Sequence, residues 1–429
     1  MKLIYPLLFV CIHIGFCKAQ TNPDTVYQPF IGTPQLFPAN NPSAMPIIKL
    51  NSSDLLELHF DDFDGNVKNY FYSFELCNAN WETANLSSFD YIKGFQQQRI
   101  AQYRLSSISQ TNYTHYQVQI PDRNCIPTRS GNYLLKVFLN GNIKNLVFTK
   151  RFYVVDGKAS IGMLIQQPFN NQFFRTHQKL QITVNTNQLQ LQNPQQQVQL
   201  VLMQNNRLDN TRTLNQPAFI RGNIIEYNGE LDGLFPAGKE YRWVDLRSFR
   251  FQSERVEKID MQQGIPYVTL KTDAERTNAR YLFYNDFNGA FVINATEQIN
   301  PYWQSDYGWV KFKFYPQTVD NYYKKKVYLS GMLTGNQLGD TALMTYNNES
   351  KCFEKQLFLK QGFYTYTYLT QDFGRREIQP ADASLTDGNY WETENEYAAF
   401  VYYRNFSGRH DELVGMVILN SRSGERISF

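Results

Sequence analysis

The stretch LLELHFDD at residues 55–62 places Leu56, Leu58 and Phe60 on one face of an extended chain, with polar residues between them. Such period-two alternation is typical of a β-strand that buries one face. The same alternation recurs in THYQVQIP at 114–121, and GNYLLKVFLNGN at 131–142 ends in Asn-Gly, a strong hairpin signal. The sequence therefore predicts half-buried antiparallel strands.

Strand-like runs continue along the chain and predict an all-β protein built from tandem β-sandwiches of the immunoglobulin or fibronectin type. We expect a first sandwich over residues 20–156, with a joint at Asp156-Gly157-Lys158. A middle β-rich domain with connecting strands is expected over 157–304, and a C-terminal sandwich over 305–429. No repeat of about 20–50 residues indicates a propeller or a solenoid.

The first nineteen residues have the pattern of a signal peptide. Lys2 precedes an apolar run that finishes with Cys17-Lys18-Ala19, so cleavage after Ala19 is expected. Phe16 precedes Cys17, and this large residue argues against a lipid anchor at that cysteine. No later stretch reaches the roughly 18 uninterrupted apolar residues of a membrane-spanning helix. The sequence predicts an exported protein without a membrane helix.

Composition excludes two further classes of protein. Lys and Arg total 42 and Asp and Glu total 39; removal of Lys2 and Lys18 with the signal leaves 40 against 39, a balance of +1. A chain so nearly neutral gives no indication of a nucleic acid partner. Aromatic residues make up 15% of the sequence, far more than in chains that cannot build a core, so disorder is not expected.

Cys77 closes an alternating run in YSFELCNANW at residues 72–81 and could be a nucleophile, a metal ligand, half of a disulfide or a buried small side chain. The cysteines that remain after the signal are Cys77, Cys125 and Cys352, an odd count without a close pair, which is not a disulfide scaffold. A Cys77–Cys125 bridge is the one pairing that we consider. Burial as a small side chain is favoured, because free cysteine is among the most buried residue types.

No local pattern predicts a catalytic residue, a metal ligand or a cofactor. The histidines outside the signal lie more than four residues from one another and from the mature cysteines: His59, His115, His177 and His410. The spacing of zinc ligands is therefore absent. The chain also lacks the G-x-S-x-G and G-x-x-x-x-G-K motifs of serine hydrolases and phosphate-binding loops.

Several stretches, taken in order, resemble one family. They include LHFDDFDGNVKNYFYSFELCNANW, YIKGF at 91–95, NYTHYQVQIP, SGNYLLKVF, KRFYVVD, GKEYRWVDLRSFR, DFNGAFVINA, SDYGWVKF, LKQGFYTYTY and ENEYAAFVYYR. This ordered series, which covers nearly the whole mature chain, is similar to the type IX secretion system plug protein family. The resemblance rests on the order of the stretches, since no single motif decides it.

The resemblance implies a non-enzymatic periplasmic protein at the inner face of the outer membrane. It would bind the periplasmic mouth of the giant translocon barrel of the secretion system and occlude the pore while no substrate passes. Association with the membrane would then run only through this partner, without a cofactor, and we expect a monomer. A periplasmic or surface carbohydrate-binding protein is the alternative function.

The resemblance also bears on individual residues. The stretch at 77–81 matches a family signature of the form C-[DN]-A-[DN]-W, which implies structural roles for four residues of this region: Cys77, Asn78, Asn80 and Gly94. We expect partner contacts on the loops of the N-terminal sandwich, because binding residues concentrate on loops carried by rigid scaffolds. The candidates are Trp81, Tyr91 and Phe95, with domain packing as the alternative role for Trp81 and Tyr91.

The C-terminal region resembles an early-set sandwich related to glycogen-type carbohydrate-binding modules. This likeness rests on VYLSGMLTGN and FEKQLFLKQGFYTYTYL. The chain departs from those modules at GNQLGDTALM, where a tryptophan usually follows the first asparagine. The resemblance therefore implies the module's fold, and the departure puts sugar binding in doubt.

Overall fold

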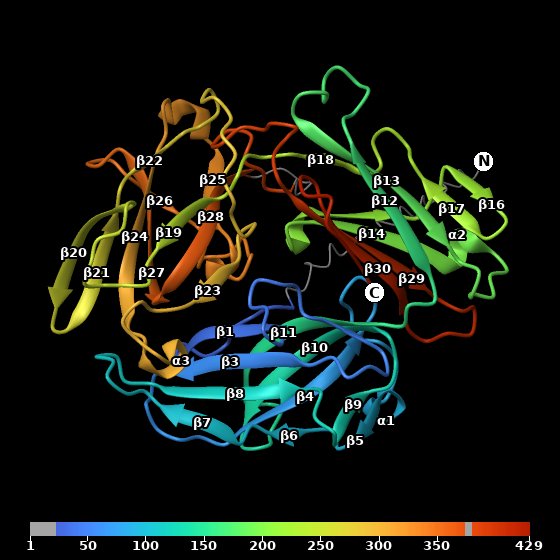
Figure 1. Ribbon diagram of the computed structural model, residues 1–429, viewed down its shortest axis with the longest axis horizontal. Coiled ribbons are helices and arrows are strands. Elements are labelled where there is room, and N and C mark those ends of the chain that lie inside the picture. Colours follow the sequence, from blue (N-terminus) through green and yellow to red (C-terminus); the bar gives the residue numbers. More distant parts are fainter. Residues whose placement is uncertain (1–22, 374–379) are drawn as a thin grey trace, which may run out of the picture.

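The computed structural model describes residues 23–373 and 380–429. Its strands form seven sheets, six of which pack in pairs as three β-sandwiches around a common centre (Figure 1). The all-β fold predicted from the alternating runs is confirmed. No helix in the described ranges is long and apolar enough to cross a membrane. The expected signal peptide and its cleavage site lie outside the described residues.

Sandwich 1 is formed by strands between residues 31 and 155. Its two sheets have the strand orders β1-β3-β8-β7 and β2-β11-β10-β4-β6, and a small third sheet pairs β5 with β9. The elements are β1 (Ile31–Pro38), β2 (Ile47–Lys49), β3 (Leu56–Asp62), β4 (Tyr70–Cys77), α1 (Ser88–Tyr91), β5 (Ile92–Gly94), β6 (Gln98–Arg99), β7 (Gln102–Leu105), β8 (Thr114–Ile120), β9 (Cys125–Pro127), β10 (Gly131–Leu139) and β11 (Leu146–Val155).

Local sequence determines the core strands of sandwich 1. Leu56, Leu58 and Phe60 on β3 are at most 1% exposed, so the apolar face of LLELHFDD is the buried one. Asn140 and Gly141 follow β10 with φ of 55° and 66°, and β10 pairs antiparallel with β11. Two successive positive φ angles suit the tight turns that join twisted strands, and Asn and Gly adopt them most readily.

Sandwich 2 combines strands from two distant parts of the chain. One sheet has the order β12-β13-β17-β16, with β18 also paired to β13, and the other has the order β15-β14-β29-β30-β31. The elements are β12 (Ser160–Gln166), β13 (His177–Asn185), α2 (Pro194–Gln197), β14 (Val198–Gln204), η1 (Leu208–Asn210), β15 (Thr211–Leu214), β16 (Phe219–Arg221), β17 (Ile224–Tyr227), β18 (Leu234–Pro236), β29 (Glu396–Tyr403), β30 (Glu412–Asn420) and β31 (Arg426–Ser428).

Sandwich 3 lies between these two parts in the sequence. Its sheets have the orders β19-β28-β23, with β25 paired to β28, and β20-β21-β24-β27-β26, with β22 paired to β24. The elements are β19 (Arg242–Asp245), β20 (Val256–Gln262), β21 (Ile265–Leu270), β22 (Asp273–Ala274), β23 (Phe291–Ile293), α3 (Pro301–Gln304), β24 (Tyr307–Tyr315), η2 (Val319–Tyr322), β25 (Lys325–Ser330), η3 (Met332–Thr334), β26 (Thr345–Asn347), β27 (Cys352–Lys360) and β28 (Gly362–Asp372).

The strand pairing corrects the boundary expected between domains at 157–304 and 305–429. The last strands of the chain pair with β14 through the register Leu200↔Val401, so they complete sandwich 2. Conversely, four strands that precede residue 305 pair with β24 or β28 of sandwich 3: β19, β21, β22 and β23. The remaining strand, β20, pairs with β21. Sandwich 3 is thus inserted between β18 and β29. An alternating run shows which of its faces is buried but does not identify the strand beside it, and this explains the error.

Sandwiches 1 and 2 share an apolar interface between the outer faces of two sheets. Tyr153 and Val155 of β11 belong to the same buried cluster as Phe400 and Tyr402 of β29 and Met416 of β30. The ring centroids of Tyr153 and Phe400 are 4.8 Å apart. A continuous hydrophobic interface of this kind keeps neighbouring domains in a fixed arrangement.

Sandwiches 1 and 3 are joined by a buried polar network around Asp61, a β3 residue whose side chain is 2% exposed. Its Oδ1 accepts a hydrogen bond from His115 Nδ1 at 2.6 Å, and its Oδ2 accepts from Tyr307 Oη and Lys360 Nζ, each at 2.5 Å. His59 Nδ1 lies 3.1 Å from His115 Nε2. Both partners of Oδ2 come from sandwich 3, so this carboxylate links the two domains.

The protonation states in this network follow from burial and charge. Burial alone would raise the pKa of Asp61, but Lys360 and then His115 hold it below its ordinary value. Burial lowers the pKa of His115 in spite of Asp61, and burial and His115 lower the pKa of His59 to about 3. Both imidazoles are therefore neutral near pH 7. His115 donates its Nδ1–H to Asp61, and its Nε2 accepts from His59.

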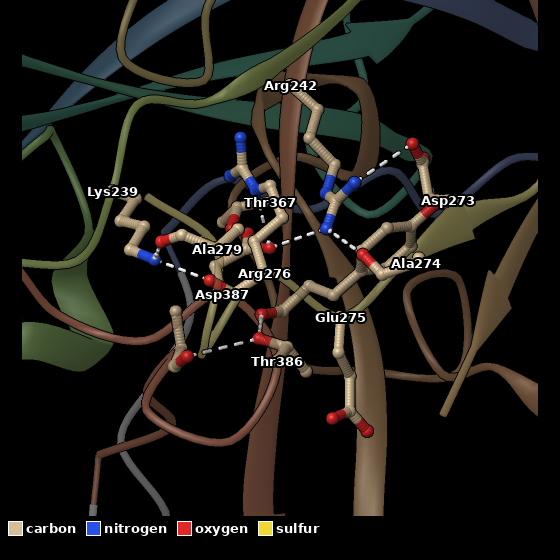
Figure 2. A network of polar contacts seen from close by, with 12 residues as sticks. Lys239, Arg242, Asp273, Ala274, Glu275, Arg276, Ala279, Thr367, Thr386 and Asp387 are labelled. Carbon is tan, nitrogen blue, oxygen red and sulfur yellow. Dashed lines mark hydrogen bonds and ion pairs between the residues drawn. The ribbon is translucent and has the colours of Figure 1, made fainter. Parts of the chain in front are cut away.

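A second buried network fixes the segments that enter and leave sandwich 3 (Figure 2). Arg242 lies between two carboxylates, with Nη1 3.0 Å from Asp273 and Nη2 2.6 Å from Asp387. Arg276 and Thr367 also donate to Asp387, at 2.9 Å each. Burial would raise the pKa of Asp387, but Arg242 and Arg276 hold it well below its ordinary range. The loop before β29 is thereby anchored to the core of sandwich 3.

Replacement of Asp61 tests the link between sandwiches 1 and 3. Asp61→Asn keeps the volume of the side chain but removes the charge that compensates buried Lys360, and we expect a loss of about 3–5 kcal/mol in the free energy of unfolding. Asp64→Asn is the matched control, because the Asp64 side chain is 49% exposed and its ion pair with Lys68 contributes about 0–1 kcal/mol. Urea unfolding measures both changes; equal losses in the two variants would contradict the assignment.

Candidate partner-binding site

The signature stretch at 77–81 forms a tight turn at the end of β4. The N–H of Trp81 donates to the carbonyl of Asn78 at 2.9 Å, and Asn78 N–H donates to the carbonyl of Glu82 at 2.8 Å. Asn80 Oδ1 accepts from Glu82 N–H at 3.1 Å. Trp81 has φ of 65°, an uncommon value for a bulky residue, so the turn is held by its surroundings.

Asn78 clamps this turn to sandwich 2. Its Oδ1 accepts from Arg404 Nη2 at 2.8 Å and from Asp411 N–H at 3.2 Å. Asp411 in turn accepts from the N–H of Ala79 at 3.0 Å and from Arg404 Nε at 2.7 Å. Arg404 and Asp411 flank the β29–β30 connection. The signature therefore joins two sandwiches, a role that the local sequence did not reveal.

A buried amide extends the clamp. Asn132 on β10 donates to the Asn78 carbonyl at 3.1 Å, and its Oδ1 accepts from Tyr402 Oη at 2.7 Å. Asn132 Nδ2 also donates to the Ala79 carbonyl at 3.4 Å. Asn132 is fully buried, so these contacts replace hydrogen bonds to water.

The thiols of Cys77 and Cys125 are buried and free, so the disulfide considered between them is not formed. Burial, and then Glu75, raise the pKa of Cys77 to about 12, while burial, and then Asp122, raise the pKa of Cys125 to about 12. A nucleophilic cysteine needs a lowered pKa, because the thiolate is the reactive species. The environment of Cys77 is therefore that of a packing residue.

The candidate contact residues Tyr91 and Phe95 have opposite exposures. Tyr91 is 6% exposed and lies in the core of sandwich 1, so its ring is not available to a partner. Phe95 is 66% exposed beside Gly94, whose φ is 99° and where a Cβ would lie 2.2 Å from the Asn124 carbonyl oxygen. Only glycine fits there. Sequence analysis missed Phe89, which is 79% exposed on the neighbouring α1.

Trp81 forms one wall of a groove between sandwiches 1 and 2, with a volume of about 820 Å³. Its ring packs edge-on against Tyr153 with the ring centroids 5.5 Å apart. We call this feature the Trp81 groove; its lining residues are Ala79, Asn80, Trp81, Glu82, Thr83, Tyr153, Val201, Met203, Leu208, Thr211, Thr213, Phe400 and Tyr402. Trp81 thus combines packing between domains with a surface that a partner can reach.

A second cavity, of about 560 Å³, lies where the three sandwiches meet and contains three carboxyl groups: Asp286, Glu394 and Glu396. Burial raises the pKa of Asp286 to about 7, and burial, and then Glu394, raise the pKa of Glu396 to about 7. The lining residues come from segments far apart in the sequence, so sequence analysis could not have assembled this cluster.

The described residues contain one pair with the geometry of a catalytic dyad and no cluster with that of a metal site. Within 23–373 and 380–429, no group of three or more His, Cys, Asp or Glu side chains is placed to hold a metal ion. The His115–Asp61 pair has the geometry of a catalytic dyad, but it is buried between domains and lines neither the Trp81 groove nor the central cavity. Its contacts support the domain interface.

Comparisons with known proteins provide a family and a relative of known structure. Residues 31–156 match the family model of the type 9 secretion system plug protein 1st domain. The chain is also similar to a hypothetical protein from Parabacteroides merdae ATCC 43184, whose crystal structure is known; the two are 30% identical with a TM-score of 0.87, over 92% of this chain and 98% of that one. No curated protein matches the chain.

The clamp predicts unequal effects for the two asparagines of the signature. Asn78→Ala removes the acceptor for Arg404 and Asp411 across the domain boundary, and we expect a loss of about 1–3 kcal/mol in the free energy of unfolding. Asn80→Ala removes one exposed local bond and should cost less than about 1 kcal/mol. Urea unfolding compares the two variants, and limited proteolysis should show faster cleavage at 404–411 in Asn78→Ala alone. An equal response of both would overturn the clamp.

The central cavity predicts a pH-dependent effect of Glu396→Gln. The pKa of Glu396 is about 7 in the folded state and 4.5 ordinarily. The contribution of Glu396 to the free energy of unfolding of the wild type therefore declines as the pH rises from 4.5 to about 7. The variant lacks this decline, and its stability relative to wild type should rise by up to about 1.4 kcal/mol per pH unit. Urea unfolding at about pH 5 and pH 8 measures the difference in the free energy of unfolding between variant and wild type. The contribution of the buried histidines is the same in both proteins and cancels in this difference. Glu349→Gln, on an exposed turn, should show none.

Proposed function

Because the chain belongs to the type 9 secretion system plug protein family, we propose that it binds the outer-membrane translocon barrel of that system from the periplasmic side and occludes the pore while no substrate passes. Family membership supports a plug role in type 9 secretion, in association with other components of the system. A position at the periplasmic side of the outer membrane is part of the proposal. The proposal adds three specific points: barrel binding, pore occlusion, and export through a signal peptide cleaved after Ala19.

The observation that carries the proposal is the rigid joining of three sandwiches into one broad body (Figure 1). Sandwich 1 is held to sandwich 2 by an apolar interface and the Asn78 clamp, and to sandwich 3 by the Asp61 network. A protein that blocks a wide pore must resist deformation, and buried, fully paired contacts between domains provide that resistance. Blocking a pore requires no reactive group.

The surface of sandwich 1 offers apolar contacts for a partner. Phe89 and Phe95 project from α1 and from the loop after β5, at 79% and 66% exposure. Exposed aromatic side chains on a rigid scaffold are the common anchors of protein interfaces. We therefore propose Phe95 and Phe89, with Trp81, as contacts to the translocon, whereas Tyr91 supports them from the core.

One observation favours carbohydrate binding as a second candidate function. The rings of Trp243 on β19 and Phe363 on β28 stack with centroids 5.8 Å apart and an interplanar angle of 16°. Both side chains are half-buried, and Phe287 packs edge-on against Phe363. Paired aromatic faces can hold a sugar ring. Retarded migration of the protein in gels that contain oligosaccharides, abolished by Trp243→Ala, would support this function.

The plug function predicts capture of one giant barrel protein. Tagged mature protein incubated with solubilised outer membranes should recover it, and deletion of the gene should make the outer membrane leak small solutes. Phe95→Asp should weaken capture about tenfold or more, since loss of an interface anchor costs at least about 1–2 kcal/mol. Phe251→Asp, which alters a phenylalanine that is 73% exposed on sandwich 3, is the matched control.

Two outcomes of the capture and deletion experiments would contradict parts of the proposal. A tight membrane in the deletion strain, together with no barrel protein recovered by the wild-type chain, would overturn the plug function. Capture that Phe95→Asp and Phe251→Asp weaken equally would leave the function in place and reject Phe95 as the contact.

A further inference from the structure

The Trp81 groove lies where sandwich 1 stops covering the outer face of a sheet of sandwich 2. Tyr153 of β11 packs over Phe400, and the shared apolar cluster reaches Met203 on β14. Beyond this point the cover ends, and Val201, Thr211 and Thr213 line open space. The groove floor is therefore continuous with the interface between the two sandwiches.

The lining of the Trp81 groove is almost uncharged, as in the apolar interface that it continues. Of the thirteen lining residues, Glu82 alone carries a charge, and the floor is formed by aliphatic and aromatic side chains. Apolar surface of this kind gains about 25 cal/mol for each Å² that a ligand removes from water. An uncharged, apolar occupant fits better than an ionic one.

A strand with an open edge borders the groove. Thr211 and Thr213 of β15 face the groove, whereas Arg212 lies over the Phe235 ring at 5.0 Å and Leu214 packs against the core of sandwich 2. In the sheet, β14 is the only neighbour of β15 among the described strands. Its other side therefore presents backbone donors and acceptors to an added strand. The strand contains neither proline nor lysine, and its one charged side chain, Arg212, lies on the face of the sheet away from the groove.

From these observations we propose that the Trp81 groove receives an extended apolar segment of the translocon, which pairs with β15 as a sixth strand of the sheet. Alternate side chains of the segment would lie on the groove face of the sheet, next to Thr211 and Thr213. Strand addition suits the site because backbone hydrogen bonds to β15 provide affinity, while the pocket beside it selects apolar side chains. The inference rests on the proposed function and names the contact through which it acts.

The length of the site limits the segment. The four residues of β15 extend over about 14 Å at a rise of about 3.4 Å per residue. About four to six residues of partner chain are enough to cover the edge, with two or three apolar side chains at alternate positions.

Thr213→Asp tests the contact, since it places a charge in the groove on an exposed position of β15. We expect at least tenfold weaker binding to purified, detergent-solubilised translocon than wild type. Ser428→Asp is the matched control: Ser428 is exposed on β31, at the opposite edge of the same sheet, and its replacement should leave binding unchanged. Urea unfolding verifies that both variants keep the wild-type stability.

Hydrogen exchange on the wild-type complex supplies a measurement that does not depend on a variant. Bound translocon should slow exchange of the outward-facing amides within 211–214 at least tenfold, because the other amides of β15 already pair with β14, and it should leave the amides of β16 and β31 unchanged. If Thr213→Asp binds the translocon as tightly as wild type and exchange at 211–214 is unchanged in the complex, the groove contact is wrong and the proposed function still stands. No binding of wild-type protein to the translocon would overturn the proposed function, and the groove contact with it.

Discussion

The pairing of β14 with β29 is the constraint on which the rest of the architecture depends. Residues 198–204 and 397–403 lie almost 200 positions apart, yet they form neighbouring strands in the middle of one sheet. The chain must therefore leave sandwich 2 after β18, build all of sandwich 3 and return beside its point of exit. Asn395 marks this crossing, because its amide donates to the carbonyl of Ala237 at 2.9 Å and to Gln178 Oε1 at 3.0 Å.

Sandwich 3 is joined to sandwich 2 by two segments of chain, one after β18 and one before β29. Two such connections allow sandwich 3 less freedom to move relative to sandwich 2 than a single linker would. The buried ion pairs of Arg242 with Asp273 and Asp387 fix both connections to its core, and Asp61 holds its other side to sandwich 1. Buried pairs contribute little net stability over apolar packing, but loss of one partner leaves a charge that water cannot reach. Such contacts favour one arrangement of the domains strongly over all others, as the proposed pore-blocking function requires.

The parts of this structure that follow from local sequence are those whose physical causes are local. The period-two pattern of Leu56, Leu58 and Phe60 determines which face of β3 is buried, and Asn140-Gly141 determines a turn. The partners of the Asn78 side chain, by contrast, lie more than 300 residues away, and nothing near Asn78 in the sequence indicates Arg404 or Asp411. For the same reason the sequence misassigned the last strands, and it did not bring together the carboxyl groups of the central cavity.

Reversible closure requires that contacts within the plug outlast contacts to its partner. Separation of sandwiches 1 and 3 would require the hydrogen bonds of Asp61 to Tyr307 and Lys360 and the aromatic contact of Phe63 with Tyr307 to break together. Release of a strand bound at β15 would instead break a few backbone hydrogen bonds, each of about 1 kcal/mol net. The apolar side chains of the segment would leave a groove that is already open to water. Because the second process is easier, a pull on the translocon segment should release the whole plug before its sandwiches part. The asymmetry between buried contacts inside and the proposed short edge contact outside therefore suits the proposed function, in which the body blocks a pore and then leaves it intact.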